Sequence, residues 1–435
     1  MFTTYEEAME WIHSRLRLGI KPGLKRMEWM MEKLDHPERR LKSIHIGGTN
    51  GKGSTVTFLR NILQEAGYSV GTFTSPYFEQ FNERISLNGI PIKDEEIIRL
   101  ANDIYPLSLE LEETDLGGPT EFEIITAMAL QYFGRIHPAD IVLFEVGLGG
   151  RFDSTNIIYP ILSVITSIGL DHTNILGDTY SQIALEKAGI IKPGTGIITA
   201  VKQEEAIEEI KNKANEMKAP MYSLGQQFFI DEHVSTPSGE SFTVKTQFRE
   251  LKDIEIEMAG KHQTENASLA VMGVELLNKY YSFLIEDEHI YAGLKSAYWP
   301  GRFEIISQEN PVIVIDGAHN EEGIQALTSE LKKRYQEKKI TIVFAALSDK
   351  ELDKMILNLD EVANKITFVE FDFPRAAEAE DLYKLSGNDN KHFNKDWKAA
   401  LDEEVNALKS DDVLVVTGSL YFLSEMKPYL LSYIK

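Results

Sequence analysis

Cysteine is absent from this chain of 435 residues. A disulfide framework, a zinc site made of thiolates and a cysteine nucleophile are therefore excluded. Basic residues are also scarce relative to acidic ones, with 45 lysines and arginines against 68 aspartates and glutamates and a formal net charge of −23. Such an acidic chain is poorly suited to polyanionic partners, so any nucleotide must be held by local geometry and metal.

Long hydrophobic runs are missing as well. No segment approaches the length that spans a membrane, and Met1–Trp11 carries Glu6, Glu7 and Glu10 where a signal peptide has basic and apolar regions. We therefore predict a cytoplasmic protein that binds neither nucleic acid nor a membrane.

The length and the 43% hydrophobic content are enough for two or three hydrophobic cores. From Leu41 onward, apolar strand-like runs alternate with helical patterns, which predicts an α/β fold with a doubly wound, mostly parallel sheet. The predicted strands are Ser69–Thr74, Asp140–Gly147, Ile161–Ile168 and Gly196–Ala200. Between Tyr222 and Met258 the pattern changes to short alternating segments, which predicts a small antiparallel sheet.

A Pro-Gly pair within Trp299–Arg302 interrupts this pattern, and a new alternating series follows it. We place the first domain at residues 1–297 and a smaller Rossmann-like α/β domain at residues 298–435. The strands predicted for the second domain are Val312–Asp316, Ile340–Leu347, Ile366–Phe371 and Val413–Gly418.

Residues Ile44–Thr55 have the pattern of a phosphate-binding loop, in which an apolar strand runs into a glycine-rich turn that opens a helix. Small residues let backbone N–H groups approach phosphate oxygens, the helix N-terminus adds the positive end of its dipole, and Lys52 adds a charge. The spacing departs from the standard Walker A motif, because three residues separate Gly47 from Gly51 and Gly53 lies between Lys52 and Ser54.

Polar residues follow the other predicted strands at the edge where ligands gather in open α/β sheets. Ser75, Glu145 and His172 stand at three such ends. A lone serine there is more often a turn residue, whereas a carboxylate closing the apolar run Ile141–Phe144 would be costly unless it were paired or bound to metal. Mg²⁺ prefers oxygen ligands, and an imidazole can complete such a set.

Several other residues are ambiguous by pattern alone. Gly147–Arg151 lacks the third glycine of the dinucleotide fingerprint, which disfavours a nicotinamide dehydrogenase. Lys187 at a helix end is typical of a solvated residue or a dipole partner, and His262 and Asn266 could be helix caps. Arg302 could pack its stem at the domain joint. Asp316–Asn320 follows a strand of the second domain, which suggests one site between the two domains.

Taken together, the motifs closely resemble those of folylpolyglutamate synthases and dihydrofolate synthases, which are members of the Mur ligase superfamily. The resemblance runs nearly end to end and is carried by Gly48–Ser54, Thr74–Pro76, Phe81–Ile85, Glu145–Arg151, Leu170–His172, Glu186–Lys192, Pro300–Arg302 and Asp316–Asn320. Several ordered motifs are far more specific than any one of them.

The resemblance implies a role for each of these positions. Residues Asn50, Gly51, Lys52, Gly53 and Ser54 would hold the phosphates of ATP, and Asn266, Arg302 and Asp316 would also contact ATP. Ser75, Glu145 and His172 would bind Mg²⁺. In the family, the lysine that matches Lys187 is carbamylated and able to bind a second metal, which reverses the preference for a solvated lysine. Residues that would hold the pterin end are Gly23, Leu24, Phe122, Glu123, Arg151 and Asp153.

The implied enzyme is an ATP-dependent amide ligase that adds L-glutamate to reduced folates and to dihydropteroate through an acyl phosphate. Lys52, Lys187 and His319 would act in catalysis, with His319 either assisting the phosphate electrostatically or handling a proton. ATP, Mg²⁺ and a carbamylated Lys187 are the implied cofactors, and K⁺ remains open. We expect a monomer whose partners are these small molecules.

Two alternatives remain. A peptidoglycan-precursor Mur ligase shares this chemistry but carries an additional N-terminal domain, for which the 44 residues before His45 are too few. A nucleotide-binding module that has lost catalysis is the alternative from another functional class.

Overall fold

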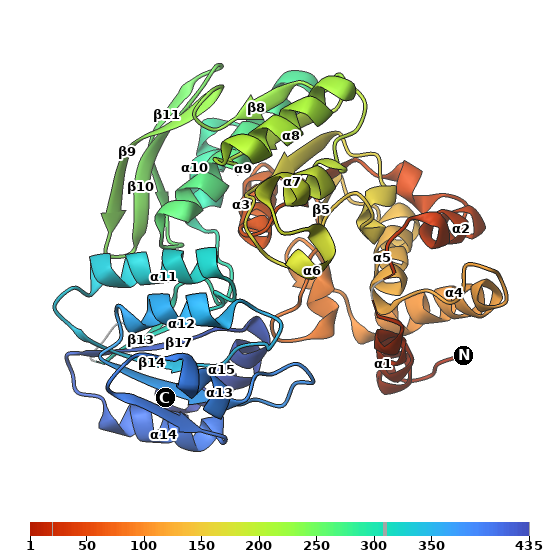
Figure 1. Cartoon of the computed structure of the whole chain (residues 1–435). Coiled ribbons are helices and arrows are strands. Elements are labelled where there is room, and N and C mark those ends of the chain that lie inside the picture. The colour runs from red at the N-terminus through yellow and green to blue at the C-terminus, as the bar shows by residue number, and fades with distance from the viewer. Residues whose placement is uncertain (20, 308–310, 435) are drawn as a thin grey trace.

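The protein consists of two α/β lobes in a computed structural model that describes residues 1–19, 21–307 and 311–434 (Figure 1). The first lobe is built on an eight-stranded sheet of order β4-β3-β2-β5-β1-β6-β7-β8. The strands are β1 (Ser43–Gly47), β2 (Val70–Phe73), β3 (Ile85–Leu87), β4 (Ile90–Pro91), β5 (Ile141–Glu145), β6 (Leu162–Ile165), β7 (Gly196–Thr199) and β8 (Met221–Ser223). All are parallel except the edge hairpin of β3 and β4, so the predicted doubly wound sheet is confirmed.

Alternating side chains of these strands enter separate hydrophobic clusters on the two faces. Ile141 and Leu143 of β5 pack on one face, and Val142 and Phe144 pack on the other. The first face is covered by α3 (Lys52–Glu65), α9 (Lys261–Tyr280) and α10 (Asp287–Lys295). The second is covered by α1 (Tyr5–Ser14), α2 (Lys25–Lys33), α4 (Asp94–Glu112), α5 (Glu121–Gln131), α7 (Tyr180–Ala188) and α8 (Glu204–Glu216). Because both faces are buried, the strands are nearly continuous apolar runs.

A three-stranded antiparallel sheet is appended to this lobe, as the alternating segments predict. Its order is β11-β10-β9, with β9 (Phe228–Thr236), β10 (Gly239–Thr246) and β11 (Glu250–Ile256). Its apolar face packs on α9 and α10 within the core that also contains Ile44 and Ile46 of β1.

The second lobe has a six-stranded sheet of order β12-β13-β17-β14-β15-β16. The strands are β12 (Glu304–Ser307), β13 (Val312–Asp316), β14 (Lys339–Phe344), β15 (Lys365–Val369), β16 (Lys391–Asn394) and β17 (Asp412–Thr417). The helices are α11 (Glu321–Arg334), α12 (Leu352–Asp360), α13 (Ala379–Leu385), α14 (Trp397–Ala407) and α15 (Leu420–Ile434). The four predicted strands are present, and the edge strands β12 and β16 are additional.

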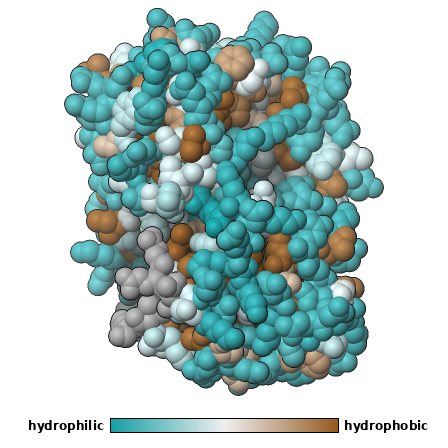
Figure 2. Space-filling view, turned by 90° about the vertical axis from the view of Figure 1, so that its left-hand side faces the viewer, coloured by the Kyte–Doolittle hydropathy of each residue, from teal (hydrophilic) through white to brown (hydrophobic). Residues whose placement is uncertain are grey.

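The loops between these elements contain short helical turns. They are η1 (Arg15–Leu18), η2 (Pro37–Arg40), η3 (Phe81–Arg84), η4 (Tyr132–Ile136), η5 (Ser154–Ile157) and the one-turn α6 (Thr173–Leu176). No helix in the described ranges combines the length and the apolar character that a membrane crossing requires. The face in Figure 2 is largely hydrophilic, and its apolar residues occur in small separate groups.

A buried ionic cluster joins the three-stranded sheet to the second lobe, where α11 faces the end of that sheet (Figure 1). The Glu240 side chain is fully buried, and its Oε1 accepts hydrogen bonds from Arg334 Nη2 of α11 (2.6 Å) and from the Gly260 backbone N–H (2.8 Å). Arg334 also donates to the Thr236 carbonyl at 2.8 Å. Because Gly260 is the N-cap of α9, this carboxylate ties both lobes to the start of that helix.

We expect Arg334→Met to destabilise the protein by about 3 kcal/mol, because the buried Glu240 carboxylate then keeps His233 as its one remaining ionisable partner among the described residues. Urea denaturation measures the loss as a lower unfolding midpoint. Lys332→Met on the same helix is the matched control, since its ion pair with Glu361 is exposed and should contribute less than about 1 kcal/mol. Equal midpoints for the two variants would contradict the importance of the cluster.

Candidate active site between the two lobes

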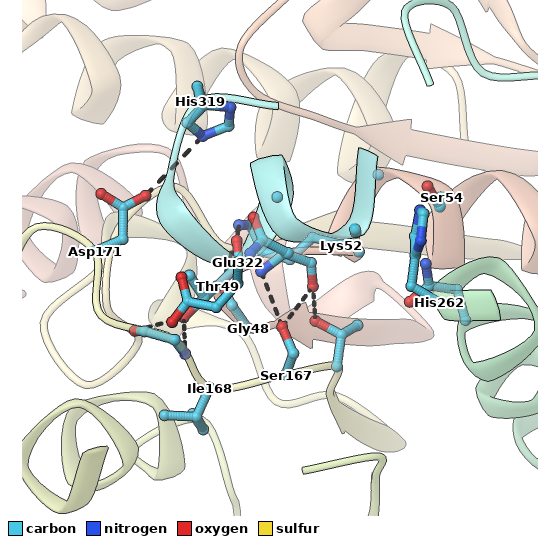
Figure 3. A pocket seen from close by; sticks show the side chains of 18 of the residues that line it. Gly48, Thr49, Lys52, Ser54, Ser167, Ile168, Asp171, His262, His319 and Glu322 are labelled. Atoms are coloured by element: carbon cyan, nitrogen blue, oxygen red, sulfur yellow. Dashed lines mark hydrogen bonds and ion pairs between the residues drawn. The ribbon is translucent and has the colours of Figure 1, made fainter. Parts of the chain in front are cut away.

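A cavity of about 380 Å³ lies between the two lobes. The first lobe contributes loops at the carboxyl ends of β1, β2, β5 and β6 and the start of α9, and the second contributes the end of β13. In Figure 3, Lys52, Thr49 and Ser167 lie centrally, Asp171 and His319 lie on one side, and Ser54 and His262 lie on the other. The arrangement matches the expectation that ligands gather where parallel strands end.

The glycine-rich loop after β1 depends on close backbone approaches. Gly51 is the N-cap of α3 with φ +86, and a Cβ there would lie 2.3 Å from the Asn266 side-chain oxygen. At Gly48 a Cβ would lie 1.9 Å from Thr166 Oγ1. Only glycine fits both positions, so the first turn of α3 can present its free N–H groups to the cavity.

Two lysines share one carbonyl oxygen of this loop. Lys52 Nζ and Lys187 Nζ each donate to the Gly48 carbonyl at 3.0 Å, and Lys52 also donates to the Thr49 carbonyl at 3.0 Å. The Lys187 residue is 5% exposed, so the pattern-based interpretation of a solvated lysine is wrong. Burial first, and the neighbouring Lys52 charge second, lower the pKa of Lys187 to about 7.

Ser75 and Glu145 meet at the ends of β2 and β5. The Ser75 backbone N–H donates to Glu145 Oε2 at 3.3 Å, and no cation of the described residues lies within 4.0 Å of this carboxylate. Burial raises the pKa of Glu145 to about 6, against the opposing charge of Lys52. A buried carboxylate with free lone pairs is suited to a metal cation.

His172 lines the same cavity from the loop after β6, where it adopts a left-handed conformation with φ +51. Its Nε2 is 3.9 Å from Asp171 Oδ1, and burial lowers its pKa, which favours the neutral imidazole able to bind a cation. Within the described parts of the chain there is no group of three histidine, aspartate and glutamate side chains arranged for a metal. A cation would therefore need Ser75 Oγ and ligand oxygens as well.

The second lobe contributes Arg302, Asp316 and His319. Asp316 accepts the backbone N–H groups of Phe303 at 2.7 Å and Ala318 at 2.8 Å, and burial raises its pKa despite the nearby Arg302 charge. His319 Nδ1 donates to the Gly317 carbonyl at 2.8 Å, and burial lowers its pKa to about 4. The ring is therefore neutral near pH 7, with Nε2 available as an acceptor.

His262 and Asn266 face the cavity from α9, and neither caps this helix. The N-cap is Gly260, whose position has no side-chain cap hydrogen bond. Asn266 Nδ2 instead donates to the Gln263 side chain at 3.0 Å, which orients the amide oxygen beside Gly51. The capping interpretation is therefore wrong for both residues.

The residues predicted to hold the pterin end do not line this cavity; they are Gly23, Leu24, Phe122, Glu123, Arg151 and Asp153. Glu123 is paired with Arg26 at 2.9 Å and closes the capping box of α5 with Thr120. Asp153 accepts the Leu148 backbone N–H at 2.8 Å. Both carboxylates are thus already engaged within the protein, and their ligand contacts stay predictions.

The contacts between the lobes at the cavity add two residues that the sequence motifs do not contain, Lys350 and Glu322. Asp171 Oδ1 pairs with Lys350 Nζ at 2.6 Å, and Asn320 Nδ2 donates to Asp171 Oδ2 at 3.2 Å. Asn320 also forms a reciprocal amide pair with Asn50 at 3.0 and 3.2 Å. Glu322 Oε1 accepts the Leu170 backbone N–H at 2.9 Å.

Comparison with protein-family models finds two matches in this chain. The model described as "Mur ligase middle domain" matches residues 113–274, and the model described as "Mur ligase, glutamate ligase domain" matches residues 301–420.

Curated relatives match over almost the whole length. The chain is 49% identical to the dihydrofolate synthase/folylpolyglutamate synthase of Bacillus subtilis over 98% of this chain and 99% of that protein. It is 32% identical to the folylpolyglutamate synthase of Lacticaseibacillus casei, over 98% of this chain and 99% of that one. Among solved structures, Mycobacterium tuberculosis folylpolyglutamate synthase complexed with ADP is 27% identical, with a TM-score of 0.91 and 98% of each chain covered. An FPGS–AMPPCP–folate complex is 31% identical, with a TM-score of 0.86 and coverage of 99% of this chain and 100% of the other.

The Asp171–Lys350 pair generates a prediction about how the lobes are held together. Burial alone would raise the pKa of Asp171, but the charge of Lys350 and its hydrogen bond to the carboxylate help to outweigh burial, and the pKa is lowered. The side chains are only 10% and 7% exposed, so Asp171→Asn or Lys350→Met should each weaken the closed arrangement by about 3 kcal/mol. The double variant should lose less than the sum.

Small-angle X-ray scattering checks this prediction, because a loosened joint increases the radius of gyration. Lys354→Met on α12 is the matched control, since the Lys354 side chain is 44% exposed and its pairs with Glu321 and Glu351 lie at the surface. An unchanged radius of gyration in both single variants would show that the Asp171–Lys350 pair does not hold the lobes together.

Proposed function

This chain belongs to the folylpolyglutamate synthase and dihydrofolate synthase family of Mur ligases, and we propose that it is an ATP-dependent ligase that adds L-glutamate to folates. The observation that carries this proposal is the single cavity in which the glycine-rich loop, Ser75, Glu145 and Lys187 of one lobe face Arg302, Asp316 and His319 of the other. Both lobes of one chain supply the cavity, which supports a monomer as the working unit.

ATP occupies this cavity with its phosphates at Asn50–Ser54. The N–H groups of the first turn of α3 and the Lys52 ammonium group bind phosphate oxygens there. Asn266, Arg302 and Asp316 contact the remainder of the nucleotide from α9 and from the second lobe. The solved relatives with AMPPCP and with ADP support a nucleotide in this fold.

Mg²⁺ is held by Ser75, Glu145 and His172, whose oxygen and imidazole donors fit a hard cation. The free lone pairs of the buried Glu145 carboxylate support this assignment. When bound, the ion supplies positive charge that offsets the negative charge of the transferring phosphoryl group. A further K⁺ rests on the family resemblance alone.

Lys187 becomes carbamylated, and two features of its surroundings support this. A pKa near 7 leaves much of the amine neutral, and the neutral amine is the form that adds to CO₂. The new N–C bond forms as the amine loses a proton, and a carboxylate replaces the ammonium group. That exchange converts a repulsive contact with Lys52 into an attractive one.

The reaction then has two balanced steps. A carboxylate oxygen of the folate attacks the γ-phosphorus of ATP, which gives an acyl phosphate and ADP. The glutamate amine attacks the acyl carbon, which gives the amide, inorganic phosphate and one proton. Lys52 offsets charge on the phosphoryl group, and neutral His319 can accept a proton through Nε2. Apposition of the second lobe excludes water from the acyl phosphate.

The acyl acceptors we propose are tetrahydrofolate and dihydropteroate, so that the chain has both activities, as the name of the Bacillus subtilis relative states for that protein. The pterin end lies near Gly23, Leu24, Phe122, Glu123, Arg151 and Asp153. The net charge of −23 supports small molecules rather than nucleic acid as partners. The names of the matched relatives do not favour a peptidoglycan-precursor ligase.

Purified protein should release phosphate from ATP only when glutamate and either dihydropteroate or tetrahydrofolate are present. A malachite-green phosphate assay with each component omitted in turn tests this expectation. Nucleotide binding without turnover under any combination would favour the inactive nucleotide-binding module. Turnover with only one of the two acceptors would restrict the chain to one activity.

In the same assay, Lys52→Ala should lower kcat by about 10²- to 10³-fold, because a charge that stabilises the phosphoryl group is lost. Circular dichroism should show an unchanged fold. Lys213→Ala, which removes an exposed i,i+3 pair with Glu216, should retain wild-type turnover. Near-normal turnover of Lys52→Ala would refute the role of the loop.

Glu145→Gln should stabilise the ligand-free protein while abolishing Mg²⁺-dependent turnover. The pKa of Glu145 is raised from 4.5 to about 6, so its ionisation costs stability as pH rises through that window, by about 2 kcal/mol in full. Thermal melts with a chelator should show a higher Tm for the variant at pH 8 and none of this gain at pH 4. A lower Tm at pH 8 would show that the carboxylate is a structural element.

A further inference from the structure

Arg84 is a buried cation without a partner. The residue is 9% exposed, and among residues 1–19, 21–307 and 311–434 no hydrogen-bond acceptor is paired with its guanidinium and no carboxylate lies within 4.0 Å. Its Nε is fully buried with no hydrogen-bond partner. The contacts it does make are with aromatic rings, since its Cζ lies 5.2 Å from the Tyr77 ring centroid and 5.8 Å from that of Phe81.

The neighbouring acid does not neutralise this charge. Glu83 uses its carboxylate to accept the backbone N–H groups of Phe78 at 2.7 Å, Glu79 at 2.9 Å and Gln80 at 2.8 Å, which orders the loop after β2. Cation–π contacts offset only part of the cost of burying the Nε–H group without a hydrogen-bond acceptor. Two other largely buried arginines are paired, Arg334 with Glu240 and Arg26 with Glu123.

The position of Arg84 follows from the strand order. Outward from the phosphate loop on β1, the sheet continues with β5, which ends at Glu145, then β2, which precedes Ser75, and then β3. Because β3 runs antiparallel to β2 and begins at Ile85, Arg84 lies at the same edge as the carboxyl end of β2. The Thr74 backbone N–H donates to the Arg84 carbonyl at 3.0 Å, which fixes this register.

This placement separates Arg84 from the phosphates. Three strand spacings put β3 about 14 Å from β1, and Lys52 already serves the phosphate end. The metal-binding pair Ser75 and Glu145 lies between them. Phe122, one of the residues predicted to hold the pterin, has its ring centroid 5.8 Å from that of Phe73 of β2 and lies against Gly147 after β5, so it is close to the same strand ends.

We propose that Arg84 binds the carboxylate of the acyl substrate, the group that is phosphorylated and becomes the amide. This inference rests on the proposed function. The planar guanidinium can hold a carboxylate through two parallel hydrogen bonds, which would point one oxygen inward to the γ-phosphate beyond Ser75 and Glu145. It also offsets the repulsion between that carboxylate and the phosphates. The product carries a neutral amide in place of this carboxylate and loses the charge-assisted contact with Arg84, which favours release of the product.

A binding experiment tests this without requiring turnover. The probes are pteroate and its carboxamide, which differ only in that the carboxylate is replaced by a neutral amide. Wild-type protein should bind pteroate about 10- to 100-fold more tightly than the carboxamide by fluorescence titration, as expected for a charge-assisted bidentate contact. Arg84→Met should bind the two ligands alike, and Arg84→Lys should restore part of the preference.

Arg334→Met is the matched control, because it makes the same change at a buried arginine that is paired within the protein. It should lower stability and leave the preference for pteroate unchanged. Arg84→Met should keep the wild-type Tm, since it removes an unpaired charge. With substrates, it should raise the KM for the folate and leave the KM values for ATP and glutamate within about twofold.

Two results would overturn the inference: an unchanged preference for pteroate in Arg84→Met, or an increase of the KM for ATP or for glutamate in place of that for the folate. A wild-type protein that prefers pteroate but never releases phosphate would refute the proposed ligase activity and leave the assignment of Arg84 standing.

Discussion

Ionisable side chains that are buried away from water need opposite charges nearby. At this cavity, much of that opposite charge comes from the other lobe. Asp171 of the first lobe pairs with Lys350 of the second at 2.6 Å, and the charge of Arg302 interacts favourably with Asp316 of its own lobe and with Glu145 of the other. Each lobe alone would leave some of these groups uncompensated in a nonpolar setting. The arrangement of the two lobes and the geometry of the cavity therefore depend on the same charge pairs.

The two sheets contribute to the site by placing the ends of their strands at the cavity. Several of the functional side chains lie at these strand ends or in the loops that follow them. Parallel β1, β5, β2 and β6 bring the glycine-rich loop, Glu145, Ser75 and His172 to one edge, although these residues are spread over more than a hundred positions in the chain. Next to the cavity-lining His262, the Glu240–Arg334 cluster connects α11 to the N-cap of α9. The helix that carries Asn266 is thus positioned by the same contact that holds the second lobe.

Local sequence patterns predicted most of the strands, because alternating or continuous apolar residues indicate which side chains are buried. The edge strands β12 and β16 were not predicted because they are only four residues long and their side chains are no more than partly buried; Lys391–Asn394 also has only one large apolar residue. The phosphate loop and the strand-end residues Ser75, Glu145 and His172 were identified because their chemistry is local. All of them line the cavity, together with Lys187, Asn266, Arg302, Asp316 and His319.

Pairings between distant residues could not be predicted in this way. Nothing near Asp171 in the sequence indicates Lys350, which lies in the other lobe, and a helix-end pattern does not reveal which face buries Lys187. The same limit applies to Arg84. Its lack of a partner is visible only when every neighbouring strand and loop is in place.

The carbonyl of Gly48 links the charge of Lys187 to that of Lys52. Both amines lie 3.0 Å from this one oxygen, which can offset only part of the repulsion between them when both are protonated. After burial, that repulsion is the second cause that lowers the pKa of Lys187 to about 7. A single backbone oxygen thereby couples the charge states of two lysines that come from different elements of the fold.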